Sequence, residues 1–142
     1  MSALNVKGVD SMKVVIKEYD EYPRIEEVDA ITLEYMQEVV GGYIEHLSLT
    51  DTIDMWFNEE GKLIPLPTNI FMVDGVKVID TIQGNILFTS CDDDGNTIGL
   101  DERDIENIID WGKRLDGGYI CDDPVLCDGV LRFFPLLDVK EF

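Results

Sequence analysis

The pair Gly41-Gly42 stands at the point where a helical pattern ends and an alternating pattern begins. The apolar residues before the pair follow helical spacing: Leu33, Met36, Val39 and Val40. Thr32 is a suitable N-cap for this helix. We expect Gly41 to take the left-handed conformation that ends a helix, and Gly42 to allow a tight reversal. Because the pair is not part of a GxGxxG pattern and follows no strand, it predicts a helix-to-strand corner and not a phosphate-binding loop.

A second helix is predicted to begin at Asp101, which acts as the N-cap, with Asp104 three residues later. Its apolar stripe comprises Ile105, Ile108, Ile109 and Leu115. Acidic residues fill its first turn and basic residues its last turn, as the helix dipole favours. Apolar runs and alternating patterns predict strands within residues 11–19, 43–49, 53–57, 76–82, 84–90 and 97–100.

Other segments are predicted to lie outside the sheet. Residues 19–31 are expected to form a charged connector, because Pro23 interrupts regular structure. Residues 64–69 contain two prolines, which lack the N–H donor that a central strand needs. Asn69 is expected to cap a short helical turn over residues 70–75.

These elements predict a single α+β domain, with an antiparallel or mixed sheet and both helices packed on one face. The expected order is roughly β-α-β-β-β-β-α. Residues 12–116 would form this core domain, and 1–11 an N-terminal extension. Residues 117–142 would form a C-terminal extension that packs on the core or extends it. The chain length of 142 residues suits one domain.

The charge of the chain restricts the partners that it can bind. It has 30 acidic and 11 basic residues, a net charge of −19, which argues against direct binding to nucleic acid or an anionic membrane. A basic protein surface is the expected partner, with the chain a monomer or a dimer. The three cysteines form no CxxC pair and His46 is the only histidine, so we expect reduced thiols, no metal and no cofactor. With no apolar run that suits a signal peptide or a membrane helix, we expect a cytoplasmic protein.

Acidic residues are concentrated between Glu18 and Glu60, where 13 of them accompany one basic residue, Arg24, a net charge of −12. The candidate partner-binding face comprises Glu18, Asp20, Glu21, Glu26, Glu27, Asp29, Glu34, Glu38, Asp54, Trp56, Glu59 and Glu60. A domain of this size is roughly 35–40 Å across, and duplex DNA of that length carries about 20–24 phosphates. The charge is therefore of the order that a mimic of DNA would need. A solvated acidic surface without a partner is the alternative.

Two stretches of the chain resemble a known family. "LEYMQEVVGGYIEHLSL" (33–49) carries the pattern VGGxIE, and "NEEGKLIPLPTN" (58–69) carries NEEGKLxxLPxN. Residues 84–86 match a third pattern more loosely. Together they resemble the domain of unknown function 3846, a family of small proteins of phages, plasmids and bacteria, over about residues 12 to 110. The resemblance implies a mobile-element setting and a cytoplasmic location, and no activity. The motif positions expected to be structural are Gly41, Gly42, Asn58, Gly61, Pro67 and Asn69.

Three motifs each allow a functional and a structural interpretation. "NEEGK" places two carboxylates beside Lys62, as an acid–base site would, but turn chemistry with Gly61 at positive φ explains it better. "CDDDGN" resembles a calcium loop, but the position that requires glutamate is Asp101, so a tight turn is favoured. Trp56 is either a binding anchor or a residue covered by the C-terminal segment.

Three functions remain open at this point. The first is an acidic inhibitor that mimics DNA and occupies the nucleic-acid groove of a host defence nuclease, such as a restriction or CRISPR enzyme. The second is a binder of a nucleotide immune signal, which would use the basic residues Lys62, Lys77, Arg103, Lys113, Arg114 and Arg132. The third, a metal-assisted hydrolase, has no supporting ligand spacing, and we expect no catalytic residue. An interaction domain without an inhibitory role is a further alternative.

Overall fold

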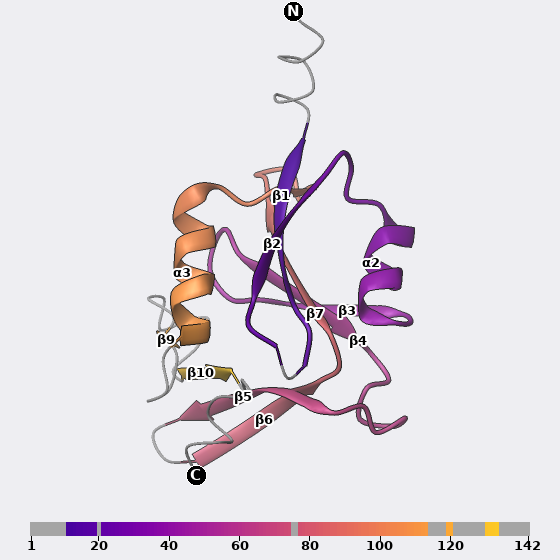
Figure 1. The fold of residues 1–142 in the computed structure, drawn as a ribbon, viewed down its shortest axis with the longest axis vertical. Helices are drawn as coiled ribbons and strands as arrows, with labels where there is room; N and C mark the ends of the chain where they lie inside the picture. Colours follow the sequence, from indigo (N-terminus) through magenta and orange to yellow (C-terminus); the bar gives the residue numbers. More distant parts are fainter. Residues whose placement is uncertain (1–10, 20, 75–76, 114–118, 121–129, 134–142) are drawn as a thin grey trace, which may run out of the picture.

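The computed structural model describes residues 11–19, 21–74, 77–113, 119–120 and 130–133. Within them, the larger sheet, here called the central sheet, has the strand order β2-β1-β7-β4-β3, with β8 paired to β7 (Figure 1). Its strands are β1 (Met12–Lys17), β2 (Arg24–Val28), β3 (Ile44–Ser48), β4 (Asp54–Asn58), β7 (Ile86–Cys91) and β8 (Thr97–Ile98). Every strand pair that the described residues form is antiparallel, which confirms an α+β fold.

A smaller sheet has the order β6-β5-β10-β9. Its strands are β5 (Thr68–Asp74), β6 (Lys77–Gln83), β9 (Tyr119–Ile120) and β10 (Val130–Phe133). The chain passes from β6 through Gly84 into β7, and so directly from the smaller sheet to the central sheet. The sequence predicted one sheet, whereas the structure has two. The predicted extensions 1–11 and 117–142 lie mostly outside the described residues.

The two helices, α2 (Leu33–Val40) and α3 (Glu102–Lys113), cover opposite faces of the central sheet (Figure 1). The cluster on the α2 face contains Val14, Ile16, Met36 and Leu87. The cluster on the α3 face includes Val15, Ile70, Phe88, Ile105 and Ile108. The prediction that both helices pack on one face is therefore wrong. Because successive side chains of a strand point to opposite faces, the apolar runs in β1 and β7 require a cover on both sides.

Two segments that the sequence assigned to other structures are strands. The predicted connector 19–31 contains β2, which pairs with β1 along its whole length. The predicted helical turn at 70–75 lies mainly in β5, so Asn69 is a strand residue and not a helix cap. Pro23 and Pro67 lie immediately before these strands, where they remove no ladder hydrogen bond. Pairing with a neighbouring strand overrides the local preferences that were read from the sequence.

The predicted starts of both helices and the predicted end of α2 are confirmed, whereas the predicted end of the second helix, with Leu115, lies outside the described residues. The Thr32 hydroxyl accepts a hydrogen bond from the Tyr35 N–H at 3.0 Å, and the Asp101 carboxylate accepts one from the Asp104 N–H at 2.8 Å. Gly41 has φ 81° in the left-handed region and ends α2. These are local signals, since each cap needs only residues within one turn.

Asn69 joins the two sheets by hydrogen bonds in a fully buried position. Its side-chain amide donates to the backbone carbonyls of Lys17 in the central sheet and of Gly84 between the sheets, both at 2.7 Å. Its Oδ1 accepts a hydrogen bond from the Lys17 Nζ at 2.7 Å, and this ammonium also donates to the Glu18 carbonyl at 2.9 Å. The Lys17 side chain is itself fully buried. Because buried polar and charged groups are costly without hydrogen-bond partners, Asn69 stabilises the joint between the sheets.

The replacement Asn69→Ala removes three of these hydrogen bonds at once. We expect it to lower the free energy of unfolding by about 3 kcal/mol, because polar groups of Lys17 and Gly84 would lose buried partners. Urea unfolding followed by circular dichroism measures this. The matched control is Asn85→Ala, which removes one exposed hydrogen bond from the Tyr19 N–H and should cost less than about 1 kcal/mol. Equal losses in the two variants would contradict the proposed role.

Gly42 lies in the short connection between α2 and β3, and a close contact there leaves no room for a side chain. A Cβ at Gly42 would lie 2.7 Å from the Nδ2 of Asn58. The Asn58 side chain is held at both ends, since it donates to the Val40 carbonyl at 3.3 Å and accepts from the Glu60 N–H at 2.8 Å. It therefore has little freedom to move away. Gly42 and Asn58 were both predicted to be structural. They contact each other where the end of α2 packs against the end of β4.

Gly61 and Pro67 also have packing roles. Gly61 does not adopt the positive φ that the sequence predicted; among the described glycines that conformation belongs to Gly41, Gly84 and Gly95. Instead, a Cβ at Gly61 would lie 3.1 Å from the Gln83 carbonyl oxygen. The Pro67 carbonyl accepts a hydrogen bond from the Gly84 N–H at 2.7 Å. Residues 59–67 therefore form a folded loop, here called the β4–β5 loop, that packs against the end of β6.

The contact between Gly42 and Asn58 can be tested by a double-mutant cycle. Gly42→Ala should lower the free energy of unfolding by about 1–3 kcal/mol in the native chain, because the added methyl group meets a fixed side chain. In an Asn58→Ala background the same replacement should cost less, since the clashing amide is gone. Thermal or urea unfolding of the four proteins gives both values. An equal cost in the two backgrounds would contradict a steric role for Gly42.

Candidate functional site

The predicted acidic face is only partly exposed. The members that are exposed are Glu21, Glu27, Asp29, Glu34, Glu38, Glu59 and Glu60. Glu18 and Glu26 are half-buried, and Asp20 lies outside the described residues. Asp54 is buried, with 5% of its surface exposed, and it accepts a hydrogen bond from the Ser48 hydroxyl at 2.9 Å. The prediction that Asp54 belongs to the partner-binding face is therefore wrong. Its side chain lies on the face of β4 that the α2 cluster covers. It is buried because the central sheet is covered on both faces.

Arg24 is paired with two of the acidic residues around it. Its guanidinium lies 3.3 Å from the Glu18 carboxylate and 3.7 Å from that of Glu26. The Tyr35 hydroxyl donates to the same Glu26 carboxylate at 2.9 Å. Burial, and then this hydrogen bond to Glu26, raise the pKa of Tyr35 above its usual range. Glu18 and Glu26 thus already have partners, whereas Glu27, Glu34 and Glu38 have no ion pair among the described residues.

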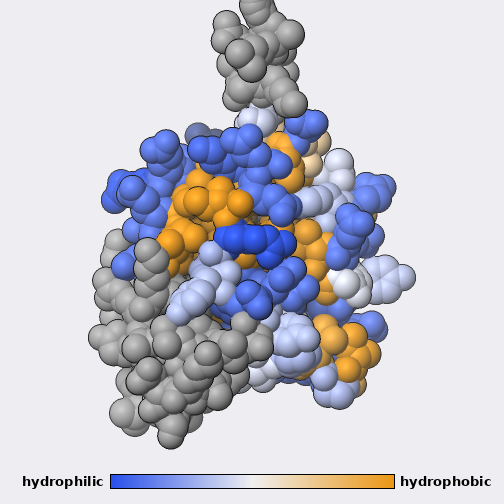
Figure 2. Space-filling model, viewed as in Figure 1, coloured by the Kyte–Doolittle hydropathy of each residue, from blue (hydrophilic) through white to orange (hydrophobic). Residues whose placement is uncertain are grey.

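Acidic side chains also cover the side of the molecule that carries α3. The exposed carboxylates there and on the turn between β7 and β8 are Asp93, Asp94, Asp101, Glu102, Glu106 and Asp110. None of them was predicted to belong to a binding face, because the acidic residues were counted along the chain and the two helices were expected on the same side. Figure 2 shows hydrophilic side chains interspersed with hydrophobic patches on the described part of the face that it draws. The acidic surface therefore extends around both helices.

Trp56 is a packing residue held by three contacts. It is half-buried against the α2 cluster, and its indole N–H donates to the Thr89 hydroxyl at 2.8 Å. Its ring stacks on the His46 imidazole, with 4.6 Å between the ring centroids. The sequence left open whether Trp56 is a binding anchor or is covered by the C-terminal segment. The contacts seen come from the α2 cluster, β3 and β7, while the C-terminal segment lies mostly outside the described residues, so both interpretations of Trp56 stay predictions.

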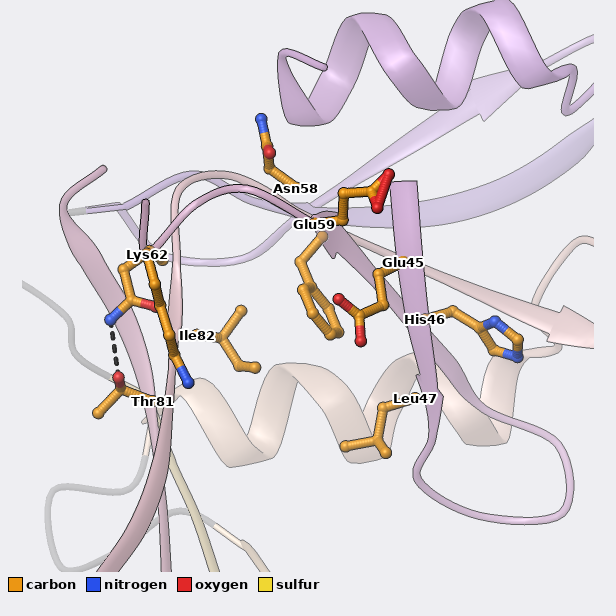
Figure 3. Close-up of a pocket in the computed structure, with 10 residues that line it drawn as sticks. Glu45, His46, Leu47, Asn58, Glu59, Lys62, Thr81 and Ile82 are labelled. Carbon is orange, nitrogen blue, oxygen red and sulfur yellow. Dashed lines mark hydrogen bonds between the residues drawn. The ribbon is translucent and has the colours of Figure 1, made fainter. Parts of the chain in front are cut away.

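A pocket of about 410 Å³ lies where the end of β6, in the smaller sheet, faces β3 and β4 of the central sheet (Figure 3). Side chains from both sheets and from the β4–β5 loop line it, among them Glu45, Leu47, Phe57, Lys62, Ile82 and Gln83. In Figure 3 the Glu45 carboxylate points into the pocket and the His46 imidazole points away from it. Glu59 lies at the rim. A carboxylate among apolar walls suits a basic group on an apolar stem.

The pocket was not predicted from the sequence, although two of its lining residues, Glu59 and Lys62, belong to the motif NEEGK. The alternation of residues 43–49 does place Glu45 and Leu47 on one face of β3, and the register pairs Glu45 with Phe57. The alternating pattern of this strand therefore could have indicated that Glu45 and Leu47 lie side by side. No local signal relates this strand to Ile82 or Gln83, which arrive through a different sheet. The pocket depends on how the two sheets meet.

A comparison with known protein families matches residues 12–113 to the domain of unknown function 3846. The chain belongs to this family. No curated protein and no solved structure matches the chain. In this family member the described helices include none that is long and apolar enough to cross a membrane.

The two acidic motifs of this family member form turns. The turn between β7 and β8 has Gly95 at φ 88°, and the Asp92 carboxylate accepts the N–H groups of Asp94 at 2.9 Å and of Asn96 at 2.8 Å. Hydrogen bonds from Asn96 lower the pKa of Asp92. The "NEEGK" segment forms the start of the β4–β5 loop. No group of three metal-ligating side chains occurs among the described residues.

Cys91 is the cysteine that the structure describes, and its environment disfavours the thiolate. Burial, and then the carboxylates of Asp54 and Asp92, raise the pKa of its thiol. The thiol donates to the Asp51 carbonyl, with 3.7 Å between sulfur and oxygen. Since the thiolate is the nucleophile, Cys91 is poorly suited to covalent chemistry at neutral pH.

The reactivity of Cys91 can be measured in a variant with Cys121→Ser and Cys127→Ser. We expect slow reaction with Ellman's reagent at pH 7, and a rate that rises with pH to an inflection above that of an ordinary cysteine, because the raised pKa reduces the thiolate fraction. The same variant unfolded in urea is the control and should react faster at pH 7. A folded protein that reacts as fast as the unfolded one would contradict the raised pKa.

Proposed function

We propose that this family member is an acidic interaction protein that occupies the nucleic-acid-binding surface of a basic partner. In the mobile-element setting that the family resemblance implies, the partner would be a host defence nuclease, such as a restriction or CRISPR enzyme, and the site of action the cytoplasm. The chain would act as a DNA mimic and inhibitor, and not as an enzyme.

One observation carries the proposal. The exposed carboxylates of β2 and α2 outnumber the exposed cations beside them among the described residues. These cations are Arg24, which is already paired with Glu18 and Glu26, and Lys13, which lies opposite Glu27 in the β1–β2 register. Glu34 and Glu38 therefore face solvent without an ion pair among the described residues, and Glu27 has only Lys13 opposite it. A potential of one sign over such a surface attracts a partner of the opposite sign and accelerates association at low salt.

The second hypothesis, nucleotide binding, receives less support from the pocket. Lys62 is the cation that lines it, but Glu45 and Glu59 are at the same pocket. A phosphate group would meet two carboxylates and one ammonium there, and like charges in close contact are repulsive. If mass spectrometry detected a nucleotide that co-purifies with the protein, nucleotide binding would become the better supported of the two hypotheses.

The proposal is tested by capture from a host lysate at low and at high salt, followed by elution with duplex DNA. The test variant changes Glu21, Glu27, Glu34 and Glu38 to Gln. The control variant has the same change in net charge and replaces Asp93 and Asp94 by Asn, and Glu102 and Glu106 by Gln. We expect the test variant to bind the captured protein about tenfold or more weakly, since four favourable charge interactions are lost. The control should bind as the native chain does.

Release of a nucleic-acid-binding protein by salt and by duplex DNA would support competition for a nucleic-acid groove. Equal capture by all three proteins, or a partner that duplex DNA does not displace, would overturn the DNA mimic. The latter result would favour an interaction domain without an inhibitory role.

A further inference from the structure

We propose that the free edge of β3 and the adjoining pocket form a docking site for an extended segment of a partner protein that carries a lysine or arginine side chain. The inference rests on the proposed function, because both require a basic partner. It goes further by assigning a location, a binding mode and a sequence pattern to the contact.

The backbone of β3 presents unpaired hydrogen-bonding groups. Among the described residues, the strand lies at one end of the central sheet and pairs with β4 on one side only. Hydrogen bonds from the Glu59 N–H to the Tyr43 carbonyl, at 3.0 Å, and from the Leu49 N–H to the Ile53 carbonyl, at 2.8 Å, fix the phase of the ladder. Because hydrogen-bonded pairs alternate in an antiparallel ladder, Glu45 and Leu47 bond to β4. Ile44, His46 and Ser48 then direct their N–H and C=O groups outward.

This edge is open to solvent. Residues 45–48 are all exposed, and no hydrogen bond within the described part of the chain involves the outward backbone groups of Ile44, His46 or Ser48. An exposed row of such groups is a template for an additional strand. Addition of a peptide strand to a sheet edge is an established mode of recognition, in which main-chain hydrogen bonds give affinity and side-chain pockets give specificity.

The pocket distinguishes β3 from the other end of the sheet, β2. Glu45 and Leu47 lie on the same face of β3, and both line the pocket. A strand added about 4.8 Å from β3 would place alternate side chains on that face. The side chain next to Glu45 would be basic, with its stem against Ile82, and the one next to Leu47 would be apolar. The partner segment therefore has a basic and an apolar residue two positions apart.

Charge selects this partner over a second copy of the chain. Two copies would bring together surfaces that belong to molecules of net charge −19 each. Such like charges repel, whereas a cationic segment is attracted to the Glu45 and Glu59 carboxylates. The occupant is therefore a different protein, and self-association is an outcome that the test must detect.

The test uses the full chain labelled with ¹⁵N and two synthetic peptides of nine residues. The first peptide is Thr-Thr-Thr-Arg-Thr-Val-Thr-Thr-Thr, and the second replaces the arginine by glutamate. With the arginine peptide, we expect chemical-shift changes at residues 44–48 and at Lys62 that saturate. With the glutamate peptide, we expect none. Shifts that move with protein concentration alone would show that β3 pairs with itself, and would overturn the proposal.

Two pairs of variants separate the contributions of the pocket and the edge. Glu45→Gln should weaken binding of the arginine peptide about fivefold, while Glu102→Gln, with the same charge change on α3, should leave it unchanged. His46→Pro removes an outward N–H without removing a bond to β4, and should weaken binding about tenfold. His46→Ala removes the stacking on Trp56 and keeps that N–H, so it should bind nearly as the native chain does.

The outcomes also separate this inference from the proposed function. If the arginine peptide causes no shifts at β3, or if Glu45→Gln and Glu102→Gln weaken it equally, the β3 site is overturned. Capture of a partner that duplex DNA displaces would then still support the acidic surface. If the peptide binds as expected while the captured protein resists duplex DNA, the β3 site stands and the DNA mimic fails.

Discussion

The buried hydrogen bonds of Asn69 fix how the two sheets meet, and the geometry of the pocket depends on them. Lys17 places a charged amine in the interior at the end of β1, where desolvation is costly unless the amine is satisfied. Asn69 supplies an acceptor for that amine and donors for two backbone carbonyls, that of Lys17 in the central sheet and that of Gly84 between the sheets. Since Thr81, Ile82 and Gln83 reach the pocket only through the smaller sheet, a change in the joint would displace one wall relative to Glu45.

The residues by which the family resemblance was recognised divide into two groups. Gly42, Asn58, Gly61 and Asn69 make close contacts that hold α2, β4 and the β4–β5 loop together, so physical packing explains them. Glu45, Glu59 and Lys62 come from the same two stretches but line the pocket with charged groups. A contribution to stability explains why the residues of the first group occur in the motifs. It does not explain the charged residues of the second group. A functional interpretation of the motifs therefore applies to their charged members, and the glycines and asparagines hold these members in place.

The sequence predicted the features that depend on neighbouring residues. Thr32, Gly41 and Asp101 act as caps because each cap needs one turn of chain, and the strands at 12–17 and 86–91 follow from their apolar runs. It did not predict β2, whose charged residues form a strand only because β1 lies beside them. The burial of Asp54 and the opposite placement of the helices follow from a sheet that is covered on both faces. The pocket combines residues 45–47, 57–59, 62 and 81–83, and no local pattern connects these segments.

The negative charge of this protein can attract a basic partner, but it does not fix the orientation in which the partner binds. Exposed carboxylates surround both α2 and α3, so a basic partner is drawn to several sides of the molecule at once. A specific complex needs directional contacts as well, and exposed ion pairs supply few of them, because they are weak and screened by salt. Backbone N–H and C=O groups on a free strand are directional, and a pocket beside them limits which side chain fits. The β3 edge has both features, so under our proposal it would set the register of the complex with a basic partner, which the acidic surface would attract without orienting.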